Sequence, residues 1–69
     1  MTLEDFQAEV LQAMSQRPSQ YRPGQAVFNY IDENYGVARH VQFVDGIDCF
    51  YDDDQIIPFI YSSYMVLYR

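Results

Sequence analysis

The stretch that decides the predicted fold is residues 39–51, Arg39-His-Val-Gln-Phe-Val-Asp45-Gly46-Ile-Asp-Cys-Phe-Tyr51. Two runs rich in β-branched and aromatic residues flank the Asp-Gly pair, and such a pair in that setting is typical of a β-hairpin with a two-residue type I′ turn. In this register Val41, Phe43 and Phe50 share one face of the hairpin. A lone hairpin is marginal in water, so we expect helices to cover at least one of its faces.

Two helical patterns precede the predicted hairpin. Thr2, with Asp5 three residues later, matches a capping box, and the apolar spacing after it predicts a helix that ends before Arg17-Pro18. A second helix is expected from about Pro23 to Asn34, because proline suits the first helical turn. Gly36 is well placed as the left-handed residue that ends this helix.

A third helix is expected after the hairpin. It begins at Asp52-Asp53-Asp54, with Asp54 or Asp53 as its N-cap, and runs to about Leu67. Its apolar residues surround the helix axis, and a helix of this kind is normally buried all round. A domain of 69 residues rarely buries a terminal helix completely, so we expect part of this helix to meet another chain.

The fold class predicted from these elements is α+β. We expect residues 1–69 to form one small domain with the element order α-α-β-β-α, in which a single β-hairpin packs against the helices. The hydrophobic content of 49% is high enough for a folded domain of this size to be expected.

The charge balance narrows the choice of partners. Ten Asp and Glu residues face four arginines and no lysine, which gives a net charge of −6. Binding nucleic acid phosphates or an anionic membrane requires several cations on one face, so neither partner is expected. The acidic N-terminus and the lack of a long apolar run predict no signal peptide and no membrane span. With one cysteine and no export signal, the expected compartment is the cytoplasm.

His40 and Cys49 are the only residues of their types, which excludes a disulfide scaffold and a zinc finger. In the predicted hairpin they lie diagonally on one face, so a Cys-His nucleophile pair is conceivable. Catalysis would also need an orienting group, an oxyanion site and a pocket, for which so small a domain has little room. We therefore predict a buried thiol beside a partly exposed imidazole, no catalytic residues and no enzymatic activity.

Acidic residues are concentrated in one segment, which contains Asp45, Asp48, Asp52, Asp53 and Asp54. Their spacing does not match a calcium-binding loop, so neither a metal site nor a cofactor is predicted. Two interpretations remain open. The aspartates can cap a helix and solvate a turn, or Asp48, Asp52 and Asp53 can form an anionic recognition patch.

The chain contains seven tyrosines and no tryptophan. Tyrosine and arginine are enriched at protein interfaces, where lysine is depleted. Tyrosines can also roof a small core with their hydroxyl groups in water. For Tyr61, Tyr64 and Tyr68, which follow one another along the third predicted helix, we favour an interface. Because a twofold dimer is the commonest closed assembly, a homodimer is expected.

Two stretches carry a resemblance. Val27-Phe-Asn-Tyr-Ile-Asp-Glu-Asn-Tyr-Gly-Val-Ala-Arg39 and Asp48-Cys-Phe-Tyr-Asp-Asp53 resemble small uncharacterised proteins carried by bacteria and their phages. The resemblance extends over residues 27–53 of the 69. It implies an origin in a phage or mobile element and transfers no functional residue; by association, it also favours an inhibitor of a host enzyme.

Two functions follow from these observations. The first is a small, acidic, non-enzymatic protein-binding module that binds or inhibits a host protein. The alternative is an acidic inhibitor that imitates nucleic acid and occupies the basic cleft of a DNA- or RNA-binding enzyme. A nucleic-acid mimic should bind in a strongly salt-dependent way, whereas an aromatic-anchored module should respond less to salt.

Overall fold

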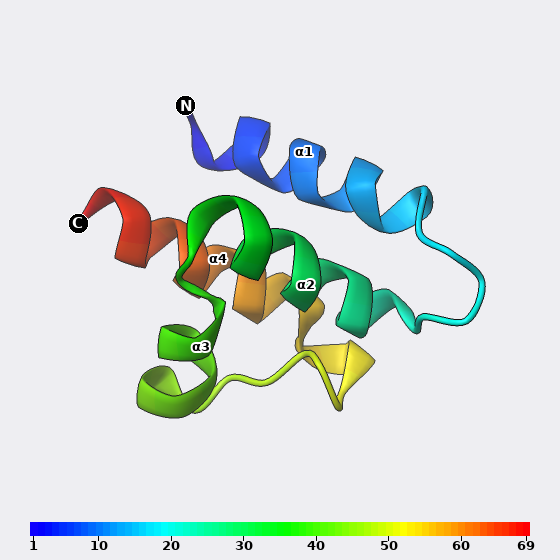
Figure 1. Ribbon diagram of the computed structural model, residues 1–69. Coiled ribbons are helices and arrows are strands. Elements are labelled where there is room, and N and C mark those ends of the chain that lie inside the picture. The colour runs from blue at the N-terminus through cyan, green and yellow to red at the C-terminus, as the bar shows by residue number, and fades with distance from the viewer.

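The computed structural model describes all residues from 1 to 69, and its regular elements are all helical. Three helices of equal length form the body of the protein, and shorter helical turns connect the second to the third (Figure 1). In chain order the elements are α1 (Leu3–Ser15), α2 (Pro23–Tyr35), α3 (Ala38–His40), a π-helical turn (Val41–Asp45), a 3₁₀ turn (Asp53–Gln55) and α4 (Ile56–Tyr68).

The two N-terminal helices form where their local signals predict. Thr2 Oγ1 accepts a hydrogen bond from the Asp5 amide at 3.1 Å, and the Asp5 carboxylate accepts one from the Thr2 amide, so the predicted capping box of α1 is confirmed. Pro23 is the first residue of α2, and Gly36 ends that helix with φ +71°. Both features confirm the prediction for the second helix.

The core lies where α1, α2 and α4 meet. The chain folds back so that α2 lies beside α1, and α4 packs against both of them (Figure 1). The short α3 and the turns around it lie against α2 and α4 on the side away from α1. The buried apolar side chains come from all of these elements: Phe6, Val10, Val27, Phe28, Ile31, Ala38, Val41, Cys49, Phe59 and Ile60.

The predicted α+β fold is wrong, because residues 39–51 do not form a hairpin. The first half of this stretch is helical, and the second half is irregular and contains no strand. A type I′ turn needs a positive φ at both central residues, but only Gly46 has one, at +71°. In this structure Gly46 is the left-handed residue that ends the π-helical turn. The Asp-Gly pair therefore terminates a helix instead of reversing a strand.

A close backbone contact attaches the irregular segment before the 3₁₀ turn to the start of α2. The Gly24 amide donates a hydrogen bond to Asp53 Oδ1 at 3.0 Å, and Cys49 Sγ donates one to the Gly24 carbonyl at 3.3 Å. A Cβ atom on Gly24 would overlap the carbonyl oxygen of Cys49 and would lie 2.7 Å from Asp53 Oδ1. Only glycine leaves room for this approach.

Replacing Gly24 with alanine tests this contact. We expect Gly24→Ala to lower the free energy of unfolding by about 3 kcal/mol, because the backbone of Cys49 must move and the surrounding core is overpacked. The matched control is Gly46→Ala, which meets open space and is strained only by its positive φ, at about 1 kcal/mol. Urea unfolding followed by circular dichroism measures both. Equal losses would contradict the special role of Gly24.

Candidate functional site

The outer face of α4 carries four large apolar side chains that the fold leaves about half exposed. At 3.6 residues per turn, Ile57, Tyr61, Met65 and Tyr68 fall within about 80° of the helix circumference. These four side chains, which we call the α4 stripe, are 53%, 53%, 46% and 52% exposed. The buried residues of α4 lie on the opposite side, where Phe59, Ile60 and Ser63 face the core. The fold thus gives α4 one buried face and one apolar exposed face.

The α4 stripe is also free of charge. No Asp, Glu, Lys or Arg occurs from Ile56 to Tyr68, although the chain as a whole has a net charge of −6. Single exposed apolar residues are normal on protein surfaces, but a contiguous row of large ones marks an interaction surface. Tyrosine and methionine are among the residue types enriched at interfaces.

The structure brings together two of the three tyrosines that the sequence singles out on this helix. Tyr61 and Tyr68 belong to the α4 stripe. Tyr64 is half-buried; its hydroxyl donates to the Met1 carbonyl at 2.8 Å, and its ring lies 5.9 Å from that of Phe6. Tyr64 therefore connects α4 to the start of α1. Its ring also lies 4.7 Å from that of Tyr68, which positions the last residue of the stripe.

Sequence reasoning left Ile57 and Met65 out of the predicted interface. Together with Tyr61 and Tyr68, these two residues follow a spacing of 4, 4 and 3 positions. This spacing places all four on one face of a helix and can be recognised in the sequence. Because nearly every position of α4 is apolar, this face could not be distinguished from the buried one until the neighbours of the helix were known.

Each aspartate of the predicted anionic patch is bonded to the backbone of this chain. Asp48 accepts the Phe50 amide at 2.9 Å, and Asp52 accepts the Asp54 amide at 3.0 Å. Asp53 accepts the Gly24 amide and lies 3.4 Å from the Arg22 guanidinium. Asp52 is therefore the N-cap of the 3₁₀ turn. The N-cap position of α4 is Gln55, which makes no side-chain capping bond, so the prediction that Asp53 or Asp54 caps the last helix is wrong. Asp48 and Asp52 thus bond amides of their own segment, and Asp53 bonds an amide in the first turn of α2, whose N-cap is Arg22.

The predicted pairing of His40 with Cys49 is not found. Cys49 is fully buried, its thiol donates to the Gly24 carbonyl, and none of the hydrogen bonds in the structure joins it to His40. Burial, reinforced by the negative charge of Asp48, raises the pKa of the Cys49 thiol to about 12. The thiol is therefore protonated at neutral pH.

A carboxylate joins α1 to α2 through two tyrosines. The hydroxyls of Tyr30 and Tyr35 both donate to Glu9 Oε2, the first at 2.8 Å. The hydrogen bond to Glu9, followed by burial and the charge of Glu9, raises the pKa of Tyr35 to about 12, and the pKa of Tyr30 also rises. A raised phenol pKa stabilises the fold below about pH 10, and this contribution is lost as the pH rises through 12. The cluster is a structural link at neutral pH.

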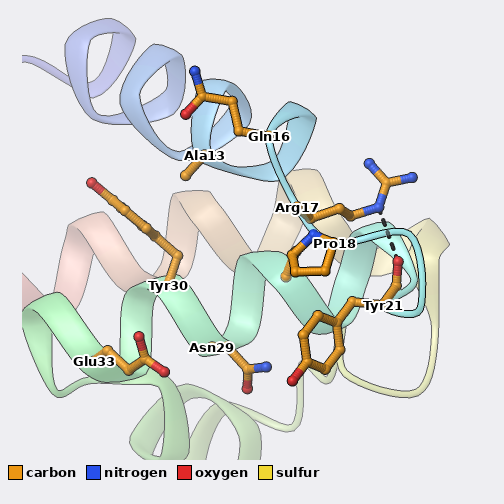
Figure 2. Close-up of a pocket in the computed structure, with 9 residues that line it drawn as sticks. Ala13, Gln16, Arg17, Pro18, Tyr21, Asn29, Tyr30 and Glu33 are labelled. Carbon is orange, nitrogen blue, oxygen red and sulfur yellow. Dashed lines mark hydrogen bonds between the residues drawn. The ribbon is translucent and has the colours of Figure 1, made fainter.

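Two hollows lie away from the α4 stripe. One, of about 340 Å³, opens between the end of α1, the connecting loop and α2, and Figure 2 shows its lining residues. Arg17 does not point into it as a free cation, because its guanidinium donates to the Tyr21 carbonyl at 3.0 Å (Figure 2) and to the Met14 carbonyl, also at 3.0 Å. The other, of about 280 Å³, is lined by Phe28, Arg39, Gln42, Phe43, Phe50 and Tyr51. Neither contains a cluster of catalytic groups.

Similarity to known proteins, membrane-spanning helices and metal-binding clusters are all absent. No protein-family model, curated protein or solved structure matches this chain. None of the helices combines the length and the hydropathy that crossing a bilayer requires. No three His, Cys, Asp or Glu side chains lie close enough together to hold a metal ion.

The Cys49 thiol provides a direct test of its environment. We expect an aromatic disulfide reagent at pH 8 to modify the native protein only as fast as it unfolds, because the thiol is buried and its pKa is about 12. Absorbance of the released thiolate measures the rate. In the control, Ile57→Cys, one exposed thiol should react at once while Cys49 remains protected. Rapid modification of the folded wild-type protein would contradict this account.

Alanine variants of Asp53 and Asp54 distinguish an aspartate that caps a helix from one that only solvates a turn. We expect Asp53→Ala to lower the free energy of unfolding by about 1–2 kcal/mol, because the Gly24 amide and Arg22 lose their acceptor. Asp54 is exposed and its carboxylate accepts no hydrogen bond, so Asp54→Ala should be nearly neutral. Urea unfolding of the two variants makes the comparison. A larger loss for Asp54→Ala would restore the cap predicted from the sequence.

Proposed function

We propose that this chain is a small, non-enzymatic protein-binding module that contacts its partner through the α4 stripe. The observation that carries the proposal is the row of four large, half-exposed side chains on a helix without charge, opposite its buried face. Burying these side chains in a complex removes apolar area from water, which is the main favourable term in protein association. Tyrosines contribute strongly at interface centres because they are large and lose little conformational freedom.

The proposal includes the cytoplasm as compartment and a host protein as the kind of partner expected for a protein of phage or mobile-element origin. The reduced, buried Cys49 fits a reducing compartment. Nucleic-acid mimicry receives no comparable support. Such a mimic needs carboxylates free to replace phosphates, whereas Asp48, Asp52 and Asp53 already accept hydrogen bonds from this chain's own backbone.

A variant on the α4 stripe tests the function. Tyr61→Glu places a charge in the middle of the stripe, at a position that is 53% exposed and so tolerates the change in the folded protein. The immobilised wild-type chain should retain one or more protein partners from a host lysate, and Tyr61→Glu should lose them. Phe43→Glu, which changes an aromatic residue that is 78% exposed on another element, should retain them.

The dependence on salt distinguishes the two functions. Binding through the α4 stripe should change little between about 0.1 and 0.5 M salt, because uncharged contacts are not screened. Partners that Tyr61→Glu still retains, but that salt or Asp48→Asn releases, would contradict the proposal and favour the mimic. Circular dichroism of each variant confirms that the helices are intact.

A further inference from the structure

We propose that the occupant of the α4 stripe is the same stripe of a second copy, so that two chains form a twofold dimer with antiparallel α4 helices. This inference rests on the proposed function: the second copy occupies the α4 stripe when no host protein is bound, and the two occupants exclude each other. Three observations support it: the order of side chains along the stripe, the distribution of charge, and the size of the surface.

The order of side chains makes the stripe complementary to itself. Ile57 and Tyr68 lie at its ends and Tyr61 and Met65 in its middle, and both pairs are centred close to Ser63. When two such helices run antiparallel, Ile57 faces Tyr68 of the second copy, and Tyr61 faces Met65. Each tyrosine ring then meets an aliphatic or thioether side chain, and contacts between sulfur and an aromatic ring are favourable. A twofold axis through the middle of the stripe repeats both contacts.

The charge distribution favours a second copy over a basic partner. Two chains of net charge −6 repel each other wherever their acidic surfaces meet. The α4 stripe avoids this repulsion, because the helix carries no charged side chain from Ile56 to Tyr68. A basic partner would require a row of carboxylates, whereas the hollow beside Met65 is lined by one carboxylate, Asp45, together with the oppositely charged Arg69.

The size of the surface predicts a weak dimer. Each half-exposed side chain of the stripe offers on the order of 100 Å², so the four bury about 400 Å² per copy and about 800 Å² in total. Flanking residues such as Pro58 and Ser62 add to this area. The total lies below the roughly 1,200 Å² at which stable specific interfaces begin, in the range of weak and transient contacts. We therefore expect a dissociation constant in the micromolar range or weaker.

Sedimentation or light scattering over a range of concentrations tests whether the dimer exists. The mass should rise from the 8.2 kDa of one chain towards twice that value as the concentration passes from micromolar to millimolar. Tyr61→Glu should remain monomeric, and the matched control Phe43→Glu should still dimerise. A wild-type chain that stays at 8.2 kDa throughout, or a dimer that survives Tyr61→Glu, overturns the inference.

Cysteine cross-linking tests the antiparallel arrangement. Ile57→Cys mixed with Tyr68→Cys should form a disulfide-linked dimer under mild oxidation, because the two positions face each other. Either variant alone should not, since its two cysteines would be separated by about 16 Å along the helix axis. Cross-linking of each variant alone, without cross-linking of the mixture, would show parallel helices and overturn the proposed pairing. The native Cys49 is buried and contributes no background.

The outcomes for the two proposals can be separated. If the chain is monomeric but Tyr61→Glu abolishes capture of another protein, the function stands and the second copy is excluded as its occupant. If the wild-type chain neither dimerises nor retains any partner that depends on Tyr61, both proposals fail.

Discussion

The contact between Gly24 and the segment from Cys49 to Asp53 is the constraint on which the rest of the structure depends. Residues 47–52 have no partner strand, so their backbone must be held by other means. Gly24 allows the carbonyl of Cys49 to approach the first turn of α2, Cys49 fills a core position, and Asp53 caps the amide of Gly24. Arg22 adds a hydrogen bond to the Phe50 carbonyl at 2.6 Å. Together these contacts determine where α4 begins.

The position of that first residue determines which face of α4 is exposed. Because α4 follows Asp53 within three residues, the position at which Asp53 is held constrains the rotation of α4 about its own axis. Phe59 and Ile60 then enter the core beside Phe28, whose ring lies 5.6 Å from that of Phe59. At the other end, Tyr64 bonds the Met1 carbonyl and fixes the last turns. The exposure of the stripe is thus a consequence of contacts at both ends of the helix.

Local signals explain which parts of the structure the sequence could predict. The capping box of α1 and the Pro23 and Gly36 boundaries of α2 depend on residues a few positions apart, and these elements formed where expected. The Asp45-Gly46 pair is also a local signal, but a glycine with positive φ serves both a hairpin turn and a helix end. Burial of Ala38 and Val41 against the neighbouring helices decided in favour of the helix. The bond from Asp53 to Gly24 joins residues 29 positions apart, and no local pattern predicts it.

The same distinction applies to the candidate site. Its location on the last helix could be predicted, because a domain of this size has too little core to surround an entirely apolar helix. Which residues belong to the site could not be predicted, because Tyr64 and Met65 are adjacent in sequence and differ only in what lies opposite them. Phe6 and Met1 occupy the space next to Tyr64, whereas Met65 remains 46% exposed. From hydrophobicity alone, the two side chains would be expected to be equally exposed. Only the packing of α1 against α4 distinguishes the intramolecular contact of Tyr64 from the surface that Met65 leaves available to a partner.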